Sequence, residues 1–358
     1  MRILHGMLEI AGQGSFSVKG LREIGQNVKM AAYNKNPGDY PCDFLLLNRN
    51  IKRIIDYPLL LLKLMLFFLY AIFRFNVFHF HFGYTLLPKN IDLVFLKLLR
   101  KKIFFEFHGS DLRTTYLAKK INPDIVLKNS SDIEKKTIKK NKKLLKFADG
   151  IILHDEELLP HLYLILKKDI PIHIIPLRMD LSLLTPVYPE ENKEIVTIVH
   201  APSHRGVKGT ESVLDAIHSL KKKYKIEFIL VENMTNVQAL EIYKKADIVI
   251  DQLRSCSYGV LSIEAMALGK PVIISIIDDI MKTYPACLPV VNANVNTINS
   301  TLEKLIIDGK LRKELGRAGT KYVEKYHDCK KIAKILLKIY NNEHKSVFGP
   351  EAYEEVNE

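Results

Sequence analysis

Residues 258–271 read Tyr-Gly-Val-Leu-Ser-Ile-Glu-Ala-Met-Ala-Leu-Gly-Lys-Pro, and this stretch decides the fold. An apolar run at 247–250 precedes it, and another at 271–275 begins with its last proline. The lengths and β-branched residues of these runs predict strands, whereas the pattern over 261–268 predicts a helix. A strand, a loop, a helix and a second strand in this order form one unit of a parallel α/β sheet.

The same alternation of short apolar runs and helical segments occurs in both halves of the 358-residue chain. In the first half we predict strands at 3–7, 77–82, 103–107, 150–153 and 172–175. In the second half we predict strands at 194–199, 226–231, 247–250 and 271–275. The fold class is therefore α/β, with two Rossmann-like domains whose parallel sheets face a central cleft.

The chain divides at a stretch that contains prolines and has weak periodicity. We predict an N-terminal domain at 1–175, a hinge at 176–189 and a C-terminal domain at 190–325. A C-terminal helix at 326–345 is expected to pack back toward the N-terminal domain. The polar tail at 346–358 is expected to fray.

The composition indicates a folded protein with an anionic partner. Lysine and arginine number 53 against 40 acidic residues, a formal net charge of +13, which suits nucleic acid, phosphorylated substrates or anionic membranes. The sequence lacks the aromatic and basic platform typical of nucleic-acid binding, so we expect no nucleic-acid partner. The four cysteines lie far apart without a Cys-x-x-Cys pair, and no signal peptide is visible. Both features predict a cytoplasmic protein.

Two segments bear on membrane contact. Leu59–Phe73 is apolar, but Lys63 interrupts it and it is shorter than the ~20 residues of a bilayer-spanning helix. We expect a buried or monotopic helix there. Lys135–Lys146 holds seven lysines in twelve positions, which fits either a solvated helix face or contact with an anionic membrane. Peripheral attachment to the inner face of the membrane stays open on this basis.

Two loops between a strand and a helix carry the candidate binding residues. In Ser203-His-Arg-Gly-Val-Lys-Gly-Thr the backbone amides at a helix start, together with Arg205 and Lys208, suit a diphosphate. In the opening stretch, Gly259 allows close approach to the backbone. Glu264 lies among apolar and small residues, where a carboxylate needs hydroxyl donors such as a ribose diol. The alternative for Arg205 and Lys208 is that they are simply solvated. The alternative for Glu264 is a salt bridge within the domain.

These motifs, in their order, resemble the group 1 family of retaining glycosyltransferases with the GT-B fold. The opening stretch is similar to that family's donor-site signature. Val77-Phe-His-Phe-His-Phe and Phe107-His-Gly-Ser-Asp resemble its His-x-His strand and its His-Gly-Ser-Asp turn. Lys208-Gly resembles the Lys-Gly pair of its phosphate loop. The resemblance spans about residues 2–340 and implies the GT-B fold.

For the donor domain, the resemblance implies a role for each matching residue. Glu264 would bind the ribose hydroxyls of a nucleoside-diphosphate-sugar, which is a co-substrate rather than a cofactor. Cys256, Tyr258 and Gly259 would line the entrance of this donor site. Arg205 and Lys208 would act as catalytic groups that neutralise the departing diphosphate.

For the N-terminal domain, the resemblance implies that His108 is a catalytic residue that hydrogen-bonds the donor sugar. A structural histidine in a turn, which Asp111 caps, is the alternative. Gly12 and Gly14 would form the loop that approaches the donor phosphate. We expect no metal: His79 and His81 alternate on one strand face without an evident third ligand and read as core or cleft residues.

The match to the family fails at two positions. Where the family usually has a second glutamate near the donor sugar, this sequence has Cys256, whose thiol cannot accept two hydroxyl hydrogen bonds as a carboxylate does. Where the family usually has an arginine before the Lys-Gly pair, it has Ser203. Either Gln252 or backbone amides hold the donor sugar instead, or catalysis has been lost.

We therefore predict a metal-independent, retaining hexosyl- or N-acetylhexosaminyl-transferase. Its acceptor is expected to be a glycan or a lipid-linked molecule of cell-surface polysaccharide or glycolipid synthesis. A non-catalytic GT-B subunit that binds a sugar nucleotide is the alternative, which Cys256 favours. An epimerase of the same fold is a further alternative that needs more acid and base groups than His108 supplies.

Overall fold

The computed structural model describes residues 1–35, 38–47 and 56–357. The chain forms two compact units, each built from separate stretches of the sequence. Unit 1 comprises residues 1–114, 130–178 and 329–348, and unit 2 comprises residues 115–129, 179–328 and 349–358. Residues 115–129, which the sequence analysis assigns to the first domain, thus group with unit 2.

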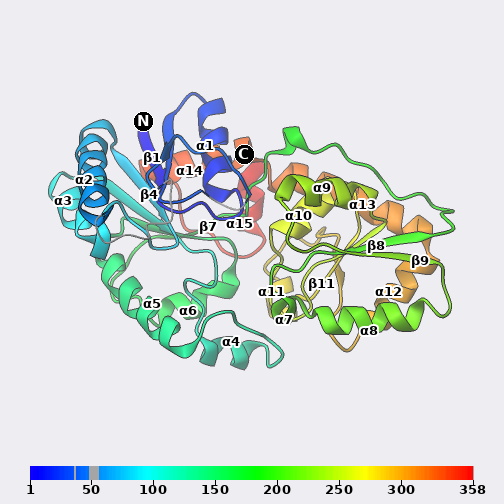
Figure 1. The fold of residues 1–358 in the computed structure, drawn as a ribbon. Coiled ribbons are helices and arrows are strands. Elements are labelled where there is room, and N and C mark those ends of the chain that lie inside the picture. Colours follow the sequence, from blue (N-terminus) through cyan, green and yellow to red (C-terminus); the bar gives the residue numbers. More distant parts are fainter. Residues whose placement is uncertain (36–37, 48–55, 358) are drawn as a thin grey trace. The chain divides into compact units, whose positions relative to one another are not determined.

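Unit 1 contains a seven-stranded parallel sheet in the order β3-β2-β1-β4-β5-β6-β7, with helices around it (Figure 1). Its strands are β1 (Arg2–Gly6), β2 (Asn27–Ala32), β3 (Phe44–Leu45), β4 (Val77–His81), β5 (Lys102–Glu106), β6 (Gly150–Leu153) and β7 (Ile172–Ile174). Its helices are α1 (Gln13–Glu23), α2 (Asp56–Arg74), α3 (Asp92–Leu98), α5 (Ser131–Leu144), α6 (Leu159–Tyr163) and α14 (Cys329–Asn341), with short 3₁₀ turns at Pro88–Asn90, Leu145–Phe147 and Glu156–Leu158. The order 3-2-1-4-5-6 is that of a Rossmann-like sheet.

Unit 2 contains a five-stranded parallel sheet in the order β12-β11-β10-β8-β9. Its strands are β8 (Val196–His200), β9 (Ile226–Leu230), β10 (Ile248–Ile250), β11 (Val272–Ile274) and β12 (Val291–Asn292). Its helices are α4 (Thr115–Ile121), α7 (Arg205–Lys208), α8 (Thr210–Leu220), α9 (Asn236–Lys245), α10 (Val260–Ala267), α11 (Asp278–Met281), α12 (Ile298–Ile307), α13 (Gly309–Tyr326) and α15 (Glu351–Glu354), with 3₁₀ turns at Leu181–Leu183 and Glu355–Asn357. Buried Ile198 and Ile250 on the strands and Leu302 on α12 lie in its core.

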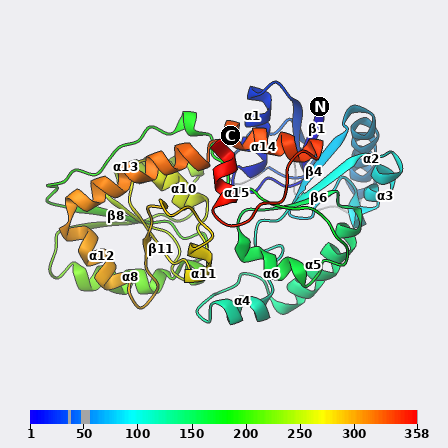
Figure 2. The ribbon, with the colours of Figure 1, turned by 180° about the vertical axis from the view of Figure 1, so that it is seen from behind.

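Helix α14 returns to unit 1 and packs on α1, as Figure 2 shows from behind. The two backbones approach so closely that a Cβ atom at Gly20 would lie 2.1 Å from the Cys329 carbonyl oxygen. Only a residue without a side chain fits there. In unit 2 the predicted polar tail contains α15, whose Ala352 and Tyr353 are buried.

The elements that the sequence did not predict include β2, β3, α4, α11, β12 and α15. Strands β3 and β12 have two residues each, which is too short for a period-two pattern to register. Leu59–Phe73 lies within α2, a helix as expected. Within the described ranges, no helix has the length and hydropathy of a membrane-crossing segment.

Candidate functional site

The predicted site residues fall in both units. Arg205, Lys208, Cys256, Tyr258, Gly259 and Glu264 belong to unit 2, whereas Gly12, Gly14 and His108 belong to unit 1.

In unit 2, Lys208 is the last residue of α7, and its side chain contacts the residues that directly follow β10. Its ammonium Nζ forms a short ion pair with Asp251, which directly follows β10, and lies 3.2 Å from Gln252 Oε1. Asp251 is fully buried, and its second oxygen accepts a 2.6 Å hydrogen bond from Ser262 on α10. The cation of the predicted phosphate loop is thus held in place by a buried carboxylate.

Helix α10 starts at Gly259, where the fold leaves room. A Cβ atom at this position would meet nothing within 4 Å, and its φ of −126° suits any residue. Neither packing nor backbone conformation within the described residues therefore requires glycine here. Close approach of a ligand to the helix start would explain why residue 259 is a glycine.

Glu264 lies one turn into α10 and is buried, with 5% of its surface exposed. Asn236, at the start of α9, donates a 2.8 Å hydrogen bond from Nδ2 to Oε1 of Glu264. Burial raises the pKa of Glu264 to about 7, and the nearby charge of Asp251 adds to the rise while Asn236 and Lys208 oppose it. A carboxylate with so few donors gains free energy from a ligand that supplies hydroxyl groups.

Arg205 is exposed and engaged with acidic side chains. Its Nε and Nη2 donate to the two carboxylate oxygens of Glu232 at 2.9 and 2.8 Å, and Nη1 lies 3.4 Å from Glu211. A diphosphate that used Arg205 would compete with Glu232, since a bidentate carboxylate occupies the same fork of donors.

The side chains of Cys256 and Tyr258 point into packed surroundings. Cys256 is buried in an apolar cluster with Ala118 and Ile125. The Tyr258 hydroxyl lies 3.1 Å from His327 Nε2 and 3.3 Å from the hydroxyl of Tyr322. Because these two side chains pack inside unit 2, a ligand at the start of α10 would meet mainly the backbone of the segment from Cys256 to Gly259.

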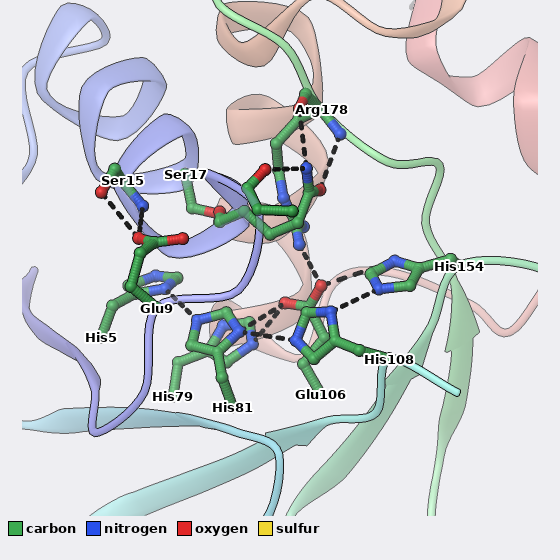
Figure 3. Close-up of polar contacts among 12 residues, drawn as sticks. His5, Glu9, Ser15, Ser17, His79, His81, Glu106, His108, His154 and Arg178 are labelled. Atoms are coloured by element: carbon green, nitrogen blue, oxygen red, sulfur yellow. Dashed lines mark hydrogen bonds and ion pairs between the residues drawn. The ribbon is translucent and has the colours of Figure 1, made fainter. Parts of the chain in front are cut away.

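In unit 1, His108 follows β5 in a tight turn. Asp111 caps this turn as expected, because its Oδ1 accepts 2.9 Å hydrogen bonds from the amides of His108 and Gly109. Both nitrogens of the His108 ring have histidine partners: Nε2 lies 3.1 Å from His81 Nδ1 and Nδ1 lies 2.7 Å from His154 Nε2 (Figure 3). Loss of solvent around the ring lowers the pKa of His108 to about 4, so the ring is neutral near pH 7.

His108 belongs to a cluster of five histidines with Glu106, Arg178 and Tyr340, in which it lies between His81 and His154. The expectation that His79 and His81 lack a third neighbouring ligand is wrong, because ring atoms of His5 lie within 4.8 Å of ring atoms of both. His81, Glu106 and His108 form a second such set among the described residues. Strand β1 pairs with β4 so that His5 lies opposite His79, which the pattern of β4 alone does not reveal.

Gly12 is the residue directly before α1, and Gly14 lies in the first turn of that helix. Gly12 has φ of +82°, in the left-handed region that favours glycine. A Cβ atom at Gly14 would lie within about 3 Å of the Met30 sulfur and of Glu9 Oε2. Glu9 already accepts hydrogen bonds from Ser15 through the amide, at 2.7 Å, and the hydroxyl, at 2.6 Å. A donor phosphate at these glycines would have to displace a carboxylate.

Sequence reasoning missed the polar groups that hold the predicted residues. Asp251 and Glu106 carried a usable signal, since each is an acidic residue within or directly after an apolar strand. Asn236, Arg178 and Tyr340 carried none, because they reach their partners from elements distant in the sequence.

Comparisons with known proteins agree with the motifs. Residues 207–322 match the family model described as Glycosyl transferases group 1, which confirms the family resemblance for that part of unit 2. No curated protein matches the chain.

Solved structures match nearly the full chain. Sucrose-phosphate synthase from Thermosynechococcus elongatus has a TM-score of 0.67 at 15% identity, over 96% of this chain and 99% of its own. Anabaena HepE in complex with UDP-glucose has a TM-score of 0.63 at 10% identity, over 96% and 100%. S. aureus MnaA in complex with UDP has a TM-score of 0.56 at 14% identity, over 98% and 100%. These likenesses establish the GT-B fold with its two Rossmann-like sheets.

Proposed function

We propose that this chain, which carries the group 1 glycosyltransferase pattern over residues 207–322, transfers a sugar from a nucleoside-diphosphate-sugar to an acceptor hydroxyl. The observation that carries the proposal is the buried Glu264 beside Asn236, on a helix whose start at Gly259 is open. A ribose diol supplies two hydroxyl donors to such a carboxylate. The amides at the helix start suit a phosphate.

The donor is proposed to be a UDP-sugar, with a hexose or an N-acetylhexosamine. Two proteins of the same fold are described with this nucleotide, HepE with UDP-glucose and MnaA with UDP. Lys208 would contact the diphosphate from its position beside Asp251, and Arg205 would do so by exchanging Glu232 for phosphate oxygens. Their charges would stabilise the diphosphate as it leaves.

Transfer is proposed to retain the anomeric configuration without a divalent metal. The acceptor oxygen forms a bond to the anomeric carbon on the face from which the diphosphate departs, and the bond from that carbon to the phosphate oxygen breaks. The acceptor proton passes to the departing phosphate oxygen. Lys208 supplies the positive charge for which other transferases use a metal ion.

The acceptor is proposed to be a glycan or lipid-linked molecule at an anionic membrane, in cell-surface polysaccharide or glycolipid synthesis. Helices α2 and α3 pack together through Phe68 and Phe95, whose ring centroids are 5.9 Å apart, and lie side by side in both views (Figures 1 and 2). Their outer faces expose large apolar side chains, namely Leu59, Leu61, Leu62, Met65, Leu66, Leu69, Tyr70, Phe73, Val94, Phe95 and Leu98.

Charge on the same unit favours a membrane as the partner of this apolar face. Arg74 and Arg100 are exposed at the ends of the two helices. Helix α5, also in unit 1, exposes Lys135, Lys136 and Lys139, so an anionic lipid surface is complementary to it. Apolar faces with basic borders are typical of proteins that bind to one leaflet. We accordingly propose a cytoplasmic protein attached peripherally to the inner face of the membrane.

A non-catalytic sugar-nucleotide-binding subunit is the second candidate. It is favoured by Cys256, which packs with Ala118 and Ile125. The donor sugar therefore has no carboxylate at the position where the family usually has its second glutamate. An epimerase is less well supported. It needs an acid or base group beside the sugar, and in unit 2 the proposed function already assigns Glu264 to the ribose hydroxyls.

Release of nucleoside diphosphate separates these candidates. Purified protein is incubated with UDP-glucose or UDP-N-acetylglucosamine, with and without EDTA, and the reaction is followed by chromatography. A transferase releases UDP by slow hydrolysis or transfer, and EDTA leaves the rate unchanged. Binding without release supports the non-catalytic subunit, and a new UDP-sugar isomer supports an epimerase.

A further inference from the structure

The cluster around Glu106 is built at the ends of neighbouring parallel strands (Figure 3). In the registers of β1, β4 and β5, His5 lies opposite His79 and His81 lies opposite Glu106. His108 follows β5 and His154 follows β6. His5, His79, His81 and Glu106 have no exposed surface, whereas His108 is partly exposed.

The members form one chain of close polar contacts. From Glu106 Oε2 it runs to His79 Nε2 at 2.9 Å, and from His79 Nδ1 to the Tyr340 hydroxyl at 2.6 Å. It continues from Tyr340 to His5 Nε2 at 3.1 Å, from His5 Nδ1 to His81 Nε2 at 3.1 Å, and from His81 Nδ1 to His108 Nε2 at 3.1 Å. The next contact joins His108 Nδ1 to His154 Nε2 at 2.7 Å. His154 Nδ1 lies 3.6 Å from Glu106 Oε1, so the chain returns to the carboxylate from which it starts.

Glu106 gives this chain a direction. An ionised carboxylate can only accept, and Arg178, which forms a short ion pair with the other oxygen of Glu106, keeps it ionised. His79 must therefore carry its proton on Nε2, because a lone pair on that nitrogen would be repelled by the carboxylate oxygen 2.9 Å away. The contact is close, although it is not aligned as a regular hydrogen bond. A neutral ring has one N–H, so His79 Nδ1 accepts from Tyr340.

Each later step follows from the one before. Tyr340 gives its proton to His79 and so accepts from His5 Nε2–H. His5 Nδ1 then accepts from His81 Nε2–H, and His81 Nδ1 accepts from His108 Nε2–H. In the opposite direction His154 would carry its proton on Nδ1, 3.6 Å from Glu106 Oε1, and the 2.9 Å contact between His79 and Glu106 would lack a proton. The distances therefore favour the first direction.

We infer that Glu106 is a positioning residue that, through His79, Tyr340, His5 and His81, holds His108 as its neutral Nε2–H tautomer with Nδ1 as an acceptor. In the free protein this acceptor takes a hydrogen bond from His154. A ligand hydroxyl that replaces His154 has to donate to His108. This consequence rests on the proposed function, whereas the tautomer itself is a property of the protein without ligand.

A metal ion is the competing explanation, because His5, His79 and His81 lie within ligand distance of one another. Two observations favour the hydrogen-bonded chain. Tyr340 bridges His5 and His79, which occupies one nitrogen of each ring. Arg178 already balances the charge of Glu106, so a divalent ion would add two uncompensated charges to a buried site.

The test is a long-range proton–nitrogen NMR correlation of the imidazole rings in the full-length protein labelled with nitrogen-15. We expect His5, His79, His81, His108 and His154 to carry the proton on Nε2. His200 is the internal control of opposite kind, since its Nδ1 lies 2.9 Å from the Ile250 carbonyl and must donate. An Nδ1–H form of His108 in the wild type would overturn the inference.

Two variants test the chain. In Tyr340→Phe the link between His79 and His5 is broken, so His79 keeps its Nε2–H form while His5, His81 and His108 become mixtures. Glu106→Gln removes the fixed acceptor and should mix all five; if that variant does not fold, Tyr340→Phe decides. An unchanged His108 in Tyr340→Phe would contradict the inference, as would one zinc ion per chain in the purified protein by elemental analysis. His200 should stay unchanged in both variants.

Discussion

Asn236 donates a hydrogen bond to Glu264 at 2.8 Å and so orients the carboxylate that the proposed function assigns to the donor ribose. The contact joins the start of α9 to the second turn of α10 in unit 2. It leaves Glu264 with a pKa raised to about 7 by burial, which one neutral donor does not reverse. A ligand with two hydroxyl donors would complete the site.

Asn236→Ala should weaken UDP binding about five- to tenfold, because one hydrogen bond that orients a charged group is worth roughly 1–1.5 kcal/mol. Isothermal titration calorimetry measures the change. Gln238→Ala is the matched control, since Gln238 completes the capping box of the same helix without contacting Glu264. A control that lost as much affinity as Asn236→Ala would point to α9 stability instead.

Nucleotide affinity should rise with pH across the raised pKa of Glu264. In the free protein the carboxyl is half protonated at about pH 7, and a ribose diol binds the ionised form, so binding releases a proton and strengthens from pH 6 to pH 8. Calorimetry in buffers of different ionisation enthalpy reports the released proton, and a 2′,3′-dideoxy nucleotide corrects for titration of the phosphate. Proton release equal for both nucleotides would contradict the ribose role.

Lys208→Met should abolish transfer and also destabilise unit 2. Removing one partner of a buried ion pair costs roughly 3–5 kcal/mol, because Asp251 is left as an uncompensated charge. Adding Asp251→Asn should restore most of the lost stability in urea unfolding, since Ser262 can still donate to an amide oxygen. The double variant should fold without releasing UDP from a UDP-sugar. Recovery of activity in it would remove Lys208 from the catalytic machinery.

The apolar face of α2 should bind anionic vesicles. Leu62→Ser with Leu66→Ser and Phe73→Ser, all exposed, should lower cosedimentation with phosphatidylglycerol vesicles at least tenfold, because apolar area and basic charge act together in interfacial binding. Lys135→Gln with Lys136→Gln and Lys139→Gln should lower it less and make it less sensitive to salt. Lys221→Gln with Lys222→Gln and Lys223→Gln, in unit 2, gives the same loss of charge as a control. Equal losses in both lysine sets would indicate attraction by net charge alone.

The architecture could be predicted because it rests on local patterns. Apolar runs of four to six residues that alternate with helical segments predicted both sheets. The stretch that opens with Tyr258 located α10 and Glu264, since a helix start and an acidic residue one turn later are read from neighbouring positions. Strands β3 and β12 were missed because two residues carry no periodicity.

The surroundings of the site residues could not be predicted from spacing. Whether Lys208 meets Asp251, or His108 meets His81, depends on which strands pair and in what register. Arg178 and Tyr340 reach Glu106 and His79 from 72 and 261 residues away. Such contacts arise from tertiary packing, and the pattern of a single segment carries no information about them.

The proposed function requires that Glu264 binds the ribose of the nucleotide. The most direct measurement is calorimetric titration of UDP, GDP and ADP into the wild type, Glu264→Gln and the control Glu241→Gln, an exposed acid on α9 paired with Lys244. We predict that UDP binds the wild type and Glu241→Gln alike and binds Glu264→Gln at least tenfold more weakly. Unchanged binding of UDP to Glu264→Gln, or no nucleotide bound by the wild type, would contradict the proposed role of Glu264.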